Sequence, residues 1–185
     1  AIREELNLPI VFLTSHTDNT TVNLACSTEP FGYILKPIDE RELRVGIEVA
    51  IYRHRTETRL RQMERWMTTT LNSIGDGVIA TDKLGKIVLM NPYAEELTGW
   101  VIDEARGRPL DEVFALRHGL TGDAMPNPAD QAMRDGIVVH IDRYTMLQPR
   151  DGAAFYIDDS AAPIRGEKDE IQGAIVVFRD ATTRM

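Results

Sequence analysis

The side chains that could carry out a reaction are few, and their spacing supports no catalytic site. Ser160 has no histidine at a recognisable triad spacing, so a serine nucleophile would lack a base. Glu95 and Glu96 could act as acids, but two adjacent glutamates in a short helical segment are more typical of a solvated helix face. The sequence contains no glycine-rich loop of the P-loop or dinucleotide type. It therefore predicts a protein that is not an enzyme.

The residues that could bind a metal or a cofactor are equally few. Cys26 is the only cysteine, which excludes an intrachain disulfide framework and a metal site built from several cysteines. His118 and His140 are candidate haem ligands, but we expect them at the surface or at a sheet edge. Four large apolar side chains could line a cavity, although such residues usually form core: Trp66, Met90, Trp100 and Phe114. The sequence predicts no metal site and demands no cofactor.

Charge and composition exclude further classes of protein. The chain has 185 residues and a net charge of −8, so an anionic nucleic acid or membrane surface would repel it. Basic residues at positions 53–61 alternate with Glu57 and precede Glu64, as on a solvated helix face. No apolar run approaches the length of a membrane span, and no signal peptide is visible. With a single cysteine, this favours a cytoplasmic protein that binds neither nucleic acid nor membrane.

A long helix is predicted from residue 39 to residue 74. Asp39 and Glu42 form a capping-box pattern at its start, and no proline follows before its end. Apolar residues recur at helical spacing in two sets, on either side of the polar residues 53–59. The helix is therefore expected to act as a lever between two domains. The second set has the spacing of a coiled-coil seam that would join two copies of the chain, through Leu60, Met63, Met67 and Ile74.

The first 55 residues show the pattern of a parallel α/β unit. Residues 9–14 form a short apolar run, typical of a strand buried on both faces, and residues 32–35 form a second strand. A short helix at about residues 21–27 would make a right-handed crossover between them. Such a unit leaves the strand at residues 9–14 with an exposed edge, which we expect to pair with another chain or to be covered by a helix at about residues 1–6.

These residues resemble the last two strands of a response-regulator receiver domain, which has a flavodoxin-like fold. The resemblance covers residues 1–55 and rests on residues 10–14 and on the element Tyr33-Ile34-Leu35-Lys36-Pro37. It implies that Thr14 contacts a phosphoryl group, that Lys36 pairs with that group, that Tyr33 is an aromatic switch and that the Lys36–Pro37 peptide is cis. The family's phosphorylated aspartate and acidic metal-binding pair have no counterpart in the sequence. We therefore expect Thr14, Tyr33 and Lys36 to be a remnant that serves packing.

From about residue 68 to residue 183 the pattern changes to antiparallel strands with short helices. Strands at residues 78–82 and 86–91 would form a hairpin. A short helix follows, with Asn91 as its cap, Pro92 in its first turn and Gly99 as its stop. A longer helix is expected at residues 127–136, capped by Asn127 and stopped by Gly136. Three more strands are expected, at about residues 138–147, 154–164 and 171–179.

This part of the chain resembles a PAS domain. The resemblance rests on residues 77–82, on residues 91–100, and on Arg179-Asp180-Ala181-Thr182, which is similar to the Asp-x-Thr element that closes PAS domains. It implies an α+β fold in which a five-stranded antiparallel sheet encloses a potential pocket. It also implies that Asn91, Asp180 and Thr182 take part in signalling, with Asp180 tying a departing helix to the sheet. A photoactive flavin would need a reactive cysteine that this part lacks, so neither that cofactor nor haem is expected.

The expected organisation is a receiver remnant at residues 1–55, a signalling helix at residues 39–74 and a PAS sensor at residues 68–183. The expected function is a sensor or regulatory module of a two-component phosphorelay, in which the PAS domain senses a ligand or mediates dimerisation. The expected partners are a second copy, through the helix and the exposed strand, and a cognate histidine kinase or output domain. The alternative is the regulatory part of a larger enzyme, a sensor histidine kinase or a diguanylate cyclase. A cofactor-binding sensor and a scaffold without a ligand also stay open.

Overall fold

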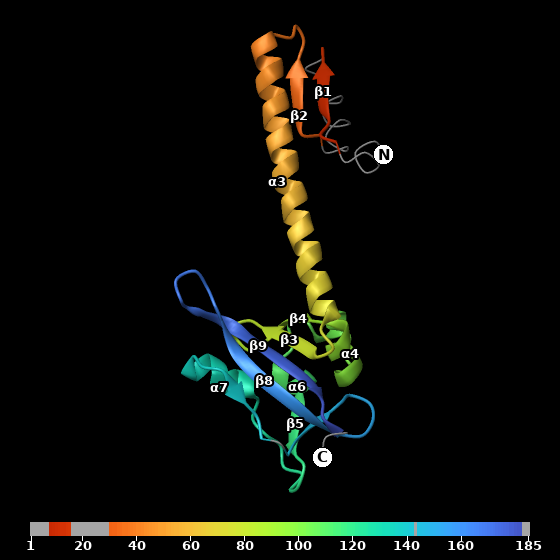
Figure 1. Ribbon diagram of the computed structural model, residues 1–185, viewed down its shortest axis with the longest axis vertical. Helices are drawn as coiled ribbons and strands as arrows, with labels where there is room; N and C mark the ends of the chain where they lie inside the picture. The colour runs from red at the N-terminus through yellow and green to blue at the C-terminus, as the bar shows by residue number, and fades with distance from the viewer. Residues whose placement is uncertain (1–7, 16–29, 143, 183–185) are drawn as a thin grey trace. The chain divides into compact units, whose positions relative to one another are not determined.

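A computed structural model describes residues 8–15, 30–142 and 144–182 (Figure 1). The chain divides into two compact units, Ala1–Met67 and Thr68–Met185, and each is described by itself. Helix α3 (Glu40–Ser73) crosses the boundary, so its last residues, from position 68 on, belong to the second unit.

The first unit contains a two-stranded parallel sheet, as the sequence predicts. Strands β1 (Val11–Thr14) and β2 (Gly32–Leu35) pair in register along all 4 residues of each. The Lys36–Pro37 peptide is cis, also as predicted. The helix expected at residues 21–27 and the covering of the strand edge expected from residues 1–6 lie outside the described residues.

Helix α3 begins and ends within one residue of its predicted bounds. Asp39 lies just before its first turn, with Oδ1 3.4 Å from the backbone amide nitrogen of Arg41. Gly46 lets β2 approach the helix closely, because a Cβ at this position would lie 2.8 Å from Cδ1 of Ile34. Ile34 and the helix residue Ala50 are both buried. The one glycine of the helix is therefore required by the packing of the strand beside it.

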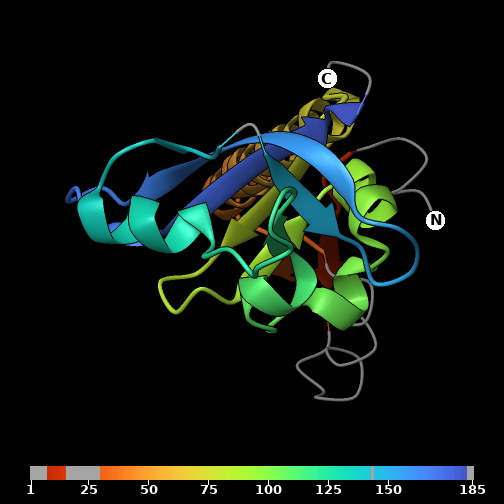
Figure 2. The same cartoon turned by 90° about the horizontal axis from the view of Figure 1, so that it is seen from below.

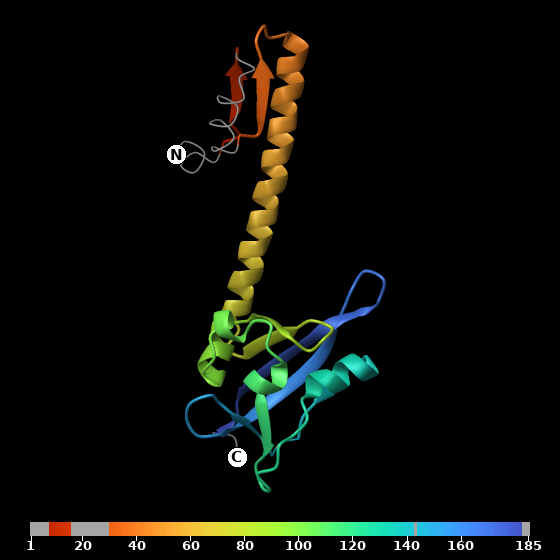
Figure 3. The same cartoon turned by 180° about the vertical axis from the view of Figure 1, so that it is seen from behind.

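The second unit is built on a seven-stranded sheet in which every pair of strands is antiparallel (Figure 1, and Figure 3 from behind). The strands lie in the order β4-β3-β9-β8-β7-β5, and β6 pairs with β8 beside that path. Their bounds are β3 Gly77–Thr81, β4 Ile87–Met90, β5 Ala115–His118, β6 Val139–His140, β7 Thr145–Gln148, β8 Phe155–Arg165 and β9 Ile171–Asp180.

The predicted number of five strands is wrong, for two physical reasons. The single strand expected at residues 138–147 is divided, because the chain turns after His140 and the carbonyl oxygen of Asp142 accepts the Thr145 amide at 3.0 Å. Residues 115–118, for which no strand was predicted, form β5 against β7. One strand thus becomes two, and one more lies at the edge of the sheet.

Four short helices cover one face of this sheet (Figure 2). Their bounds are α4 Pro92–Thr98, α5 Ile102–Ala105, α6 Leu110–Val113 and α7 Pro128–Asp135. Asn91 and Asn127 cap α4 and α7 with their side chains, and Gly99 and Gly136 end these helices with positive φ, all four as predicted. Helices α5 and α6 were not predicted, since a helix of 4 residues is too short to show a periodic pattern.

The core lies between these helices and the inner face of the sheet. Phe114, which follows α6, and Phe178 of β9 are its largest fully buried side chains, and their ring centroids are 4.6 Å apart. Met90 is also core, as expected, and the half-buried Trp100 packs against the core. The expectation of core is wrong for Trp66, which is 71% exposed because α3 presents this turn to solvent.

Candidate functional site

One buried asparagine joins three elements of the second unit. Asn91 donates through Nδ2 to the carbonyl oxygens of Leu71 at 3.1 Å and Asp76 at 3.0 Å. Its Oδ1 accepts the backbone amides of Val78 and Ala94, both at 2.9 Å. An asparagine side chain has two donor hydrogens and accepts two hydrogen bonds, so its whole capacity is used. Asn91 thereby ties the last turn of α3 to β3 and to α4.

The local sequence accounts for only one of these four bonds. Met90 ends β4 and Pro92 begins α4, which places Asn91 at the cap position that the sequence predicts. The other three bonds reach residues 13, 15 and 20 positions away along the chain. Sequence periodicity does not report such contacts, so the cap was predicted and the junction was not.

Strands β3 and β9 bring the chain that leaves α3 beside the chain that leaves the sheet. Gly77, the first residue of β3, pairs with Phe178 of β9. A Cβ on Gly77 would lie 2.6 Å from the Phe178 ring, so only glycine allows this approach. Beyond β9, the Ala181 amide donates to the carbonyl oxygen of Tyr156 at 2.9 Å. Both ends of the unit are therefore fixed to the same sheet.

A group of charged side chains lies at the same place. Nη2 of Arg179 donates to Oδ2 of Asp158 at 2.8 Å, across the β8–β9 pair. The pKa of the Arg179 guanidinium is raised, first by its hydrogen bond to Asp158, then by the charge of Asp158 and last by that of Asp76. These groups are exposed, and exposed ion pairs contribute little to stability.

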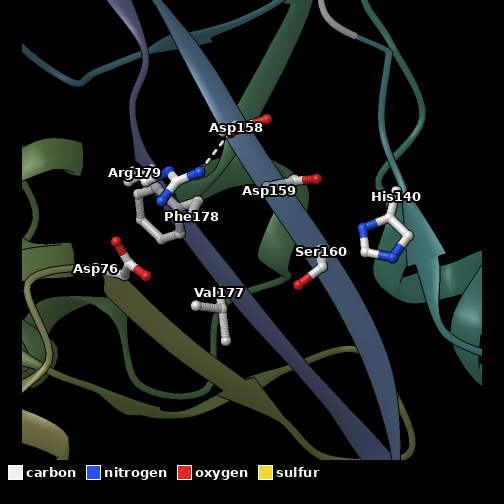
Figure 4. A pocket seen from close by; sticks show the side chains of 8 residues that line it. All are labelled: Asp76, His140, Asp158, Asp159, Ser160, Val177, Phe178 and Arg179. Atoms are coloured by element: carbon white, nitrogen blue, oxygen red, sulfur yellow. Dashed lines mark hydrogen bonds and ion pairs between the residues drawn. The ribbon is translucent and has the colours of Figure 1, made fainter.

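These side chains line a cleft of about 280 Å³ (Figure 4). Its lining consists of Asp76, His140, Asp158, Asp159, Ser160, Val177, Phe178 and Arg179. His140 and Ser160 are directly opposite each other in register, which their separation in the sequence does not predict. No hydrogen bond joins these two described side chains, and Figure 4 shows none, so the pair lacks the geometry of an activated nucleophile.

Asp159 is a residue of this site that the sequence analysis missed. Both of its carboxylate oxygens are buried, and neither has a hydrogen-bond partner within residues 8–15, 30–142 and 144–182. Burial raises the pKa of Asp159 to about 7. The backbone amide of Ile141 lowers this pKa, although it does not reach hydrogen-bond geometry, and the charge of Asp158 raises it further. Strand alternation carried the signal, because Asp159 shares a face with the core residues Ile157 and Ala161.

The residues expected to close the domain lie at the end of β9. Oδ1 of Asp180 accepts the amide of Thr182 at 2.8 Å, which caps the turn that follows the strand. Asp180 pairs in register with Ile157. The backbone amide of the next residue, Ala181, is bonded to the sheet, and the tie between Asp180 and a departing helix stays a prediction. The departing helix itself lies outside the described part of the chain.

The three residues of the expected phosphoryl site lie in the first unit. Thr14 ends β1 opposite the last residue of β2, and its carbonyl oxygen accepts the Lys36 amide at 2.8 Å. Tyr33 stacks on Phe12 with ring centroids 6.1 Å apart. Thr14 and Lys36 are thus neighbours at the carboxyl end of the sheet, and Tyr33 lies within β2.

The residues of the expected dimer seam differ in their placement. Leu60, Met63 and Met67 lie on α3 with exposed fractions of 58%, 68% and 58%. Ile74 lies one residue beyond the helix, which ends at Ser73. Three of the four residues therefore form an exposed apolar stripe on one helix, and the fourth does not belong to it.

The described residues contain no arrangement that would bind a metal. No group of three or more His, Cys, Asp and Glu side chains among them is placed to hold an ion. The candidate haem ligands lie on the short strands β5 and β6, where His118 ends its strand and His140 is exposed, as expected. None of the helices in the described ranges has the length and apolar character needed to cross a membrane.

Comparison with known proteins gives both a family match and relatives. A family model described as the PAS fold matches residues 67–181. The probable diguanylate cyclase DgcE of Escherichia coli (strain K12) is 30% identical over 148 residues, which cover 77% of this chain and 13% of DgcE. The signal transduction histidine-protein kinase AtoS of the same organism is 30% identical over 122 residues, which cover 63% of this chain and 19% of AtoS. The chain thus spans less than a fifth of either relative.

Solved structures show the same fold. A PAS domain from Colwellia psychrerythraea matches with a TM-score of 0.52 at 22% identity, over 66% of this chain and 99% of that one. An RNA-binding Light-Oxygen-Voltage receptor matches with a TM-score of 0.50 at 22% identity, over 68% of this chain and 35% of that one. At this identity the likeness concerns the fold alone. Residues 1–66 lie outside the matched family model.

Proposed function

Because the chain belongs to the PAS-fold family, we propose that it is the sensor module of a larger signalling protein. In this proposal the second unit receives a stimulus and passes it along α3 and along the segment that follows β9. Two observations support it: the relatives are a probable diguanylate cyclase and a histidine kinase, and the chain spans only 13% and 19% of their lengths. Catalysis would then belong to other domains, and this chain would not be an enzyme.

The observation that carries the proposal is the set of four hydrogen bonds made by Asn91. A shift of α4 or β3 moves the bonding partners of one buried side chain, and that side chain also holds the Leu71 carbonyl in the last turn of α3. Unmaking any one bond leaves a buried polar group unpaired, which costs about 1–3 kcal/mol. The three elements are therefore expected to move together, as a sensor coupled to a helix requires.

Dimerisation through α3 would pass this movement to a second copy of the chain. Leu60, Met63 and Met67 have the spacing of a coiled-coil seam and are more than half exposed. Two copies that bury this stripe against each other would convert a rotation of the helix into a change of register. We propose this stripe as the homodimer contact, with Ile74 excluded because it lies beyond the helix.

Disulfide cross-linking tests the dimer. In a Cys26→Ser background, Leu60→Cys and Met67→Cys are expected to form interchain disulfides readily under mild oxidation. Arg65→Cys is the matched control, since it is also exposed on α3 but lies away from the stripe. Equal cross-linking at all three positions, or none at positions 60 and 67, would eliminate the seam.

For the first unit we propose a receiver remnant with no phosphoryl transfer of its own. The parallel β1–β2 pair and the adjacent Thr14 and Lys36 support this interpretation. The residues would then serve packing, and a two-component role would depend on partner domains such as a cognate histidine kinase. Incubation with acetyl phosphate and Mg²⁺ is expected to leave the intact mass unchanged. A phosphoryl adduct located in residues 1–55 would contradict this.

The second candidate function is the regulatory part of a diguanylate cyclase. The observation that favours it is the extent of the match to DgcE, which covers 77% of the chain and is longer than the family match. The purified chain is expected to produce no cyclic dinucleotide from GTP. The complete gene product that contains it is expected to do so, with a rate that changes in Asn91→Ala. Phosphohistidine formation by that product from ATP would favour the kinase instead.

A further inference from the structure

Asp159 occupies a position in the fold that a carboxylate does not ordinarily hold. It lies on β8 between Ile157 and Ala161, on the face of the sheet that forms the core. In the β8–β9 ladder it is directly opposite Phe178, whose ring packs against Phe114. Its neighbours on this face of the sheet are therefore aromatic and aliphatic, and both of its oxygens are buried.

Among the residues that the structure describes, no partner compensates for the burial of this carboxylate. Neither oxygen is hydrogen-bonded to a described residue. The titratable groups that line the same cleft are Asp76, His140 on β6, Asp158 on β8 and Arg179 on β9. Arg179 is bonded to Asp158, His140 lies opposite Ser160 on the other face of the sheet, and Asp158 carries a like charge. An ionised carboxylate without a partner is costly in such a place, whereas a protonated one is tolerated.

The structure beside Asp159 has a weak point. The short strand β6 pairs with β8 at only two positions, Val139 opposite Ala161 and His140 opposite Ser160. The ladder then stops, and pairing with β8 resumes only in β7. The amide of Ile141, next to Asp159, therefore lies where the sheet is interrupted. A segment held by so short a ladder is the first that would give way to admit water.

We propose that Asp159 is a proton-controlled switch: the protonated side chain stays buried against the core, and its ionisation displaces β6 and lets water reach the carboxylate. The proton leaves to solvent, and hydration replaces the missing hydrogen bonds. Phe178 faces Asp159 on one side and contacts the start of β3 on the other, so the change would arise next to the Asn91 junction. This inference goes beyond the proposed function, since it needs neither a dimer nor an output domain.

Two measurements on the whole chain test the switch. The side-chain carboxyl carbon of Asp159, followed by NMR, is expected to titrate near neutral pH rather than near its ordinary value of about 4. Amide exchange at positions 139–141, corrected for intrinsic base catalysis, is expected to be at least about tenfold faster at about pH 8.5 than at about pH 5.5. In Asp159→Asn this difference is expected to disappear.

Asp158→Asn is the matched control, because it removes the neighbouring exposed carboxylate and leaves the buried one in place. It is expected to keep the pH dependence of exchange. Titration of Asp159 at about 4, or an unchanged pH dependence in Asp159→Asn, would overturn the proposal. If Asp159→Asn does not fold, the carboxyl titration of the unaltered chain decides alone. Cross-linking along α3 does not enter either measurement, so failure of the dimer and failure of the switch are told apart.

Discussion

Two polar side chains of the second unit, each with buried polar atoms, have opposite surroundings. Asn91 uses its complete hydrogen-bonding capacity and joins α3, β3 and α4. Asp159, on the opposite side of β9 from β3, has both oxygens buried and no hydrogen-bond partner among the described residues. A side chain whose hydrogen-bonding groups are all satisfied fixes the geometry of its neighbours. An ionisable side chain whose hydrogen-bonding groups are unsatisfied makes that geometry depend on its charge. One region is therefore suited to transmit a movement, and the other to start one.

The largest effect on stability is expected at Asn91, whose hydrogen-bonding groups are all satisfied. Asn91→Ala leaves two amides and two carbonyl groups without their partner, so the free energy of unfolding should fall by about 3 kcal/mol or more. Urea denaturation followed by tryptophan fluorescence measures it. Asn127→Ala is the matched control: it also removes a helix cap, but one whose Oδ1 accepts only the Ala129 amide among the described residues, and it should cost only about 1 kcal/mol. Equal losses in the two variants would reduce Asn91 to an ordinary cap.

The next effect on stability is expected at Asp159, as a function of pH. The pKa of Asp159 in the folded chain is about 7, well above its ordinary value of 3.8, so the folded state keeps a proton that the unfolded state has lost between these values. The free energy of unfolding should therefore fall as the pH rises from about 4 to about 7, by at most about 4 kcal/mol. Below this range both states are protonated, and above it the loss is complete.

Difference measurements isolate this contribution. The fall should be absent in Asp159→Asn and retained in Asp158→Asn, in urea titrations repeated across the pH range. Asp111, whose pKa is raised by partial burial and by Asp130, contributes equally in all three proteins and cancels. A curve for Asp159→Asn that runs parallel to that of the unaltered chain would remove the contrast between the two regions.

A smaller effect is expected where β3 meets β9, between the two sites. In Gly77→Ala the new Cβ would lie 2.6 Å from the Phe178 ring, which must move within a packed core, at a cost of about 1–2 kcal/mol. Gly75→Ala is the control, since a Cβ there would meet nothing within 4 Å. Thermal unfolding of both variants measures the difference. If the midpoints match, Phe178 moves freely and cannot link Asp159 to the start of β3.

The smallest effect is expected at the exposed ion pair. Arg179→Gln removes the partner of Asp158, but exposed pairs contribute little because water and salt screen them. The urea midpoint should stay unchanged at low and at high salt. A salt-dependent loss of stability would mean that the pair, rather than the Asn91 junction, holds the two ends of the unit together.

The sequence predicted those features of the fold that depend on near neighbours. Asn91 and Gly99 mark the ends of α4 because capping requires particular residue types within three or four positions. The bounds of α3 follow from the same kind of signal. The division of the strand at residues 138–147 was missed, since it depends on a turn at Asp142 that the alternation of the flanking residues conceals. Strand β5 was missed because its 4 residues gain their partner only in three dimensions.

At the Asn91 and Asp159 sites, too, the sequence could predict the features that depend on near neighbours and not those that depend on distant residues. The cap made by Asn91 was visible, but its bonds to Leu71, Asp76 and Val78 cross 13 to 20 residues. The inward position of Asp159 could be found from its alternation with Ile157 and Ala161, once β8 is recognised as a strand with one face in the core. The lack of a hydrogen-bond partner for Asp159 within the described part of the chain could not be found from the sequence, because it depends on where β6 ends.

The pairing of Gly77 with Phe178 places the first strand residue of the second unit against one of the last. The sheet of this unit therefore begins and ends at neighbouring positions, as is common in domains. The unit can be added to a polypeptide, removed from it or repeated in tandem, while the chain before and after it continues from nearly the same point. This one strand pair therefore makes the fold portable among proteins of very different length and composition.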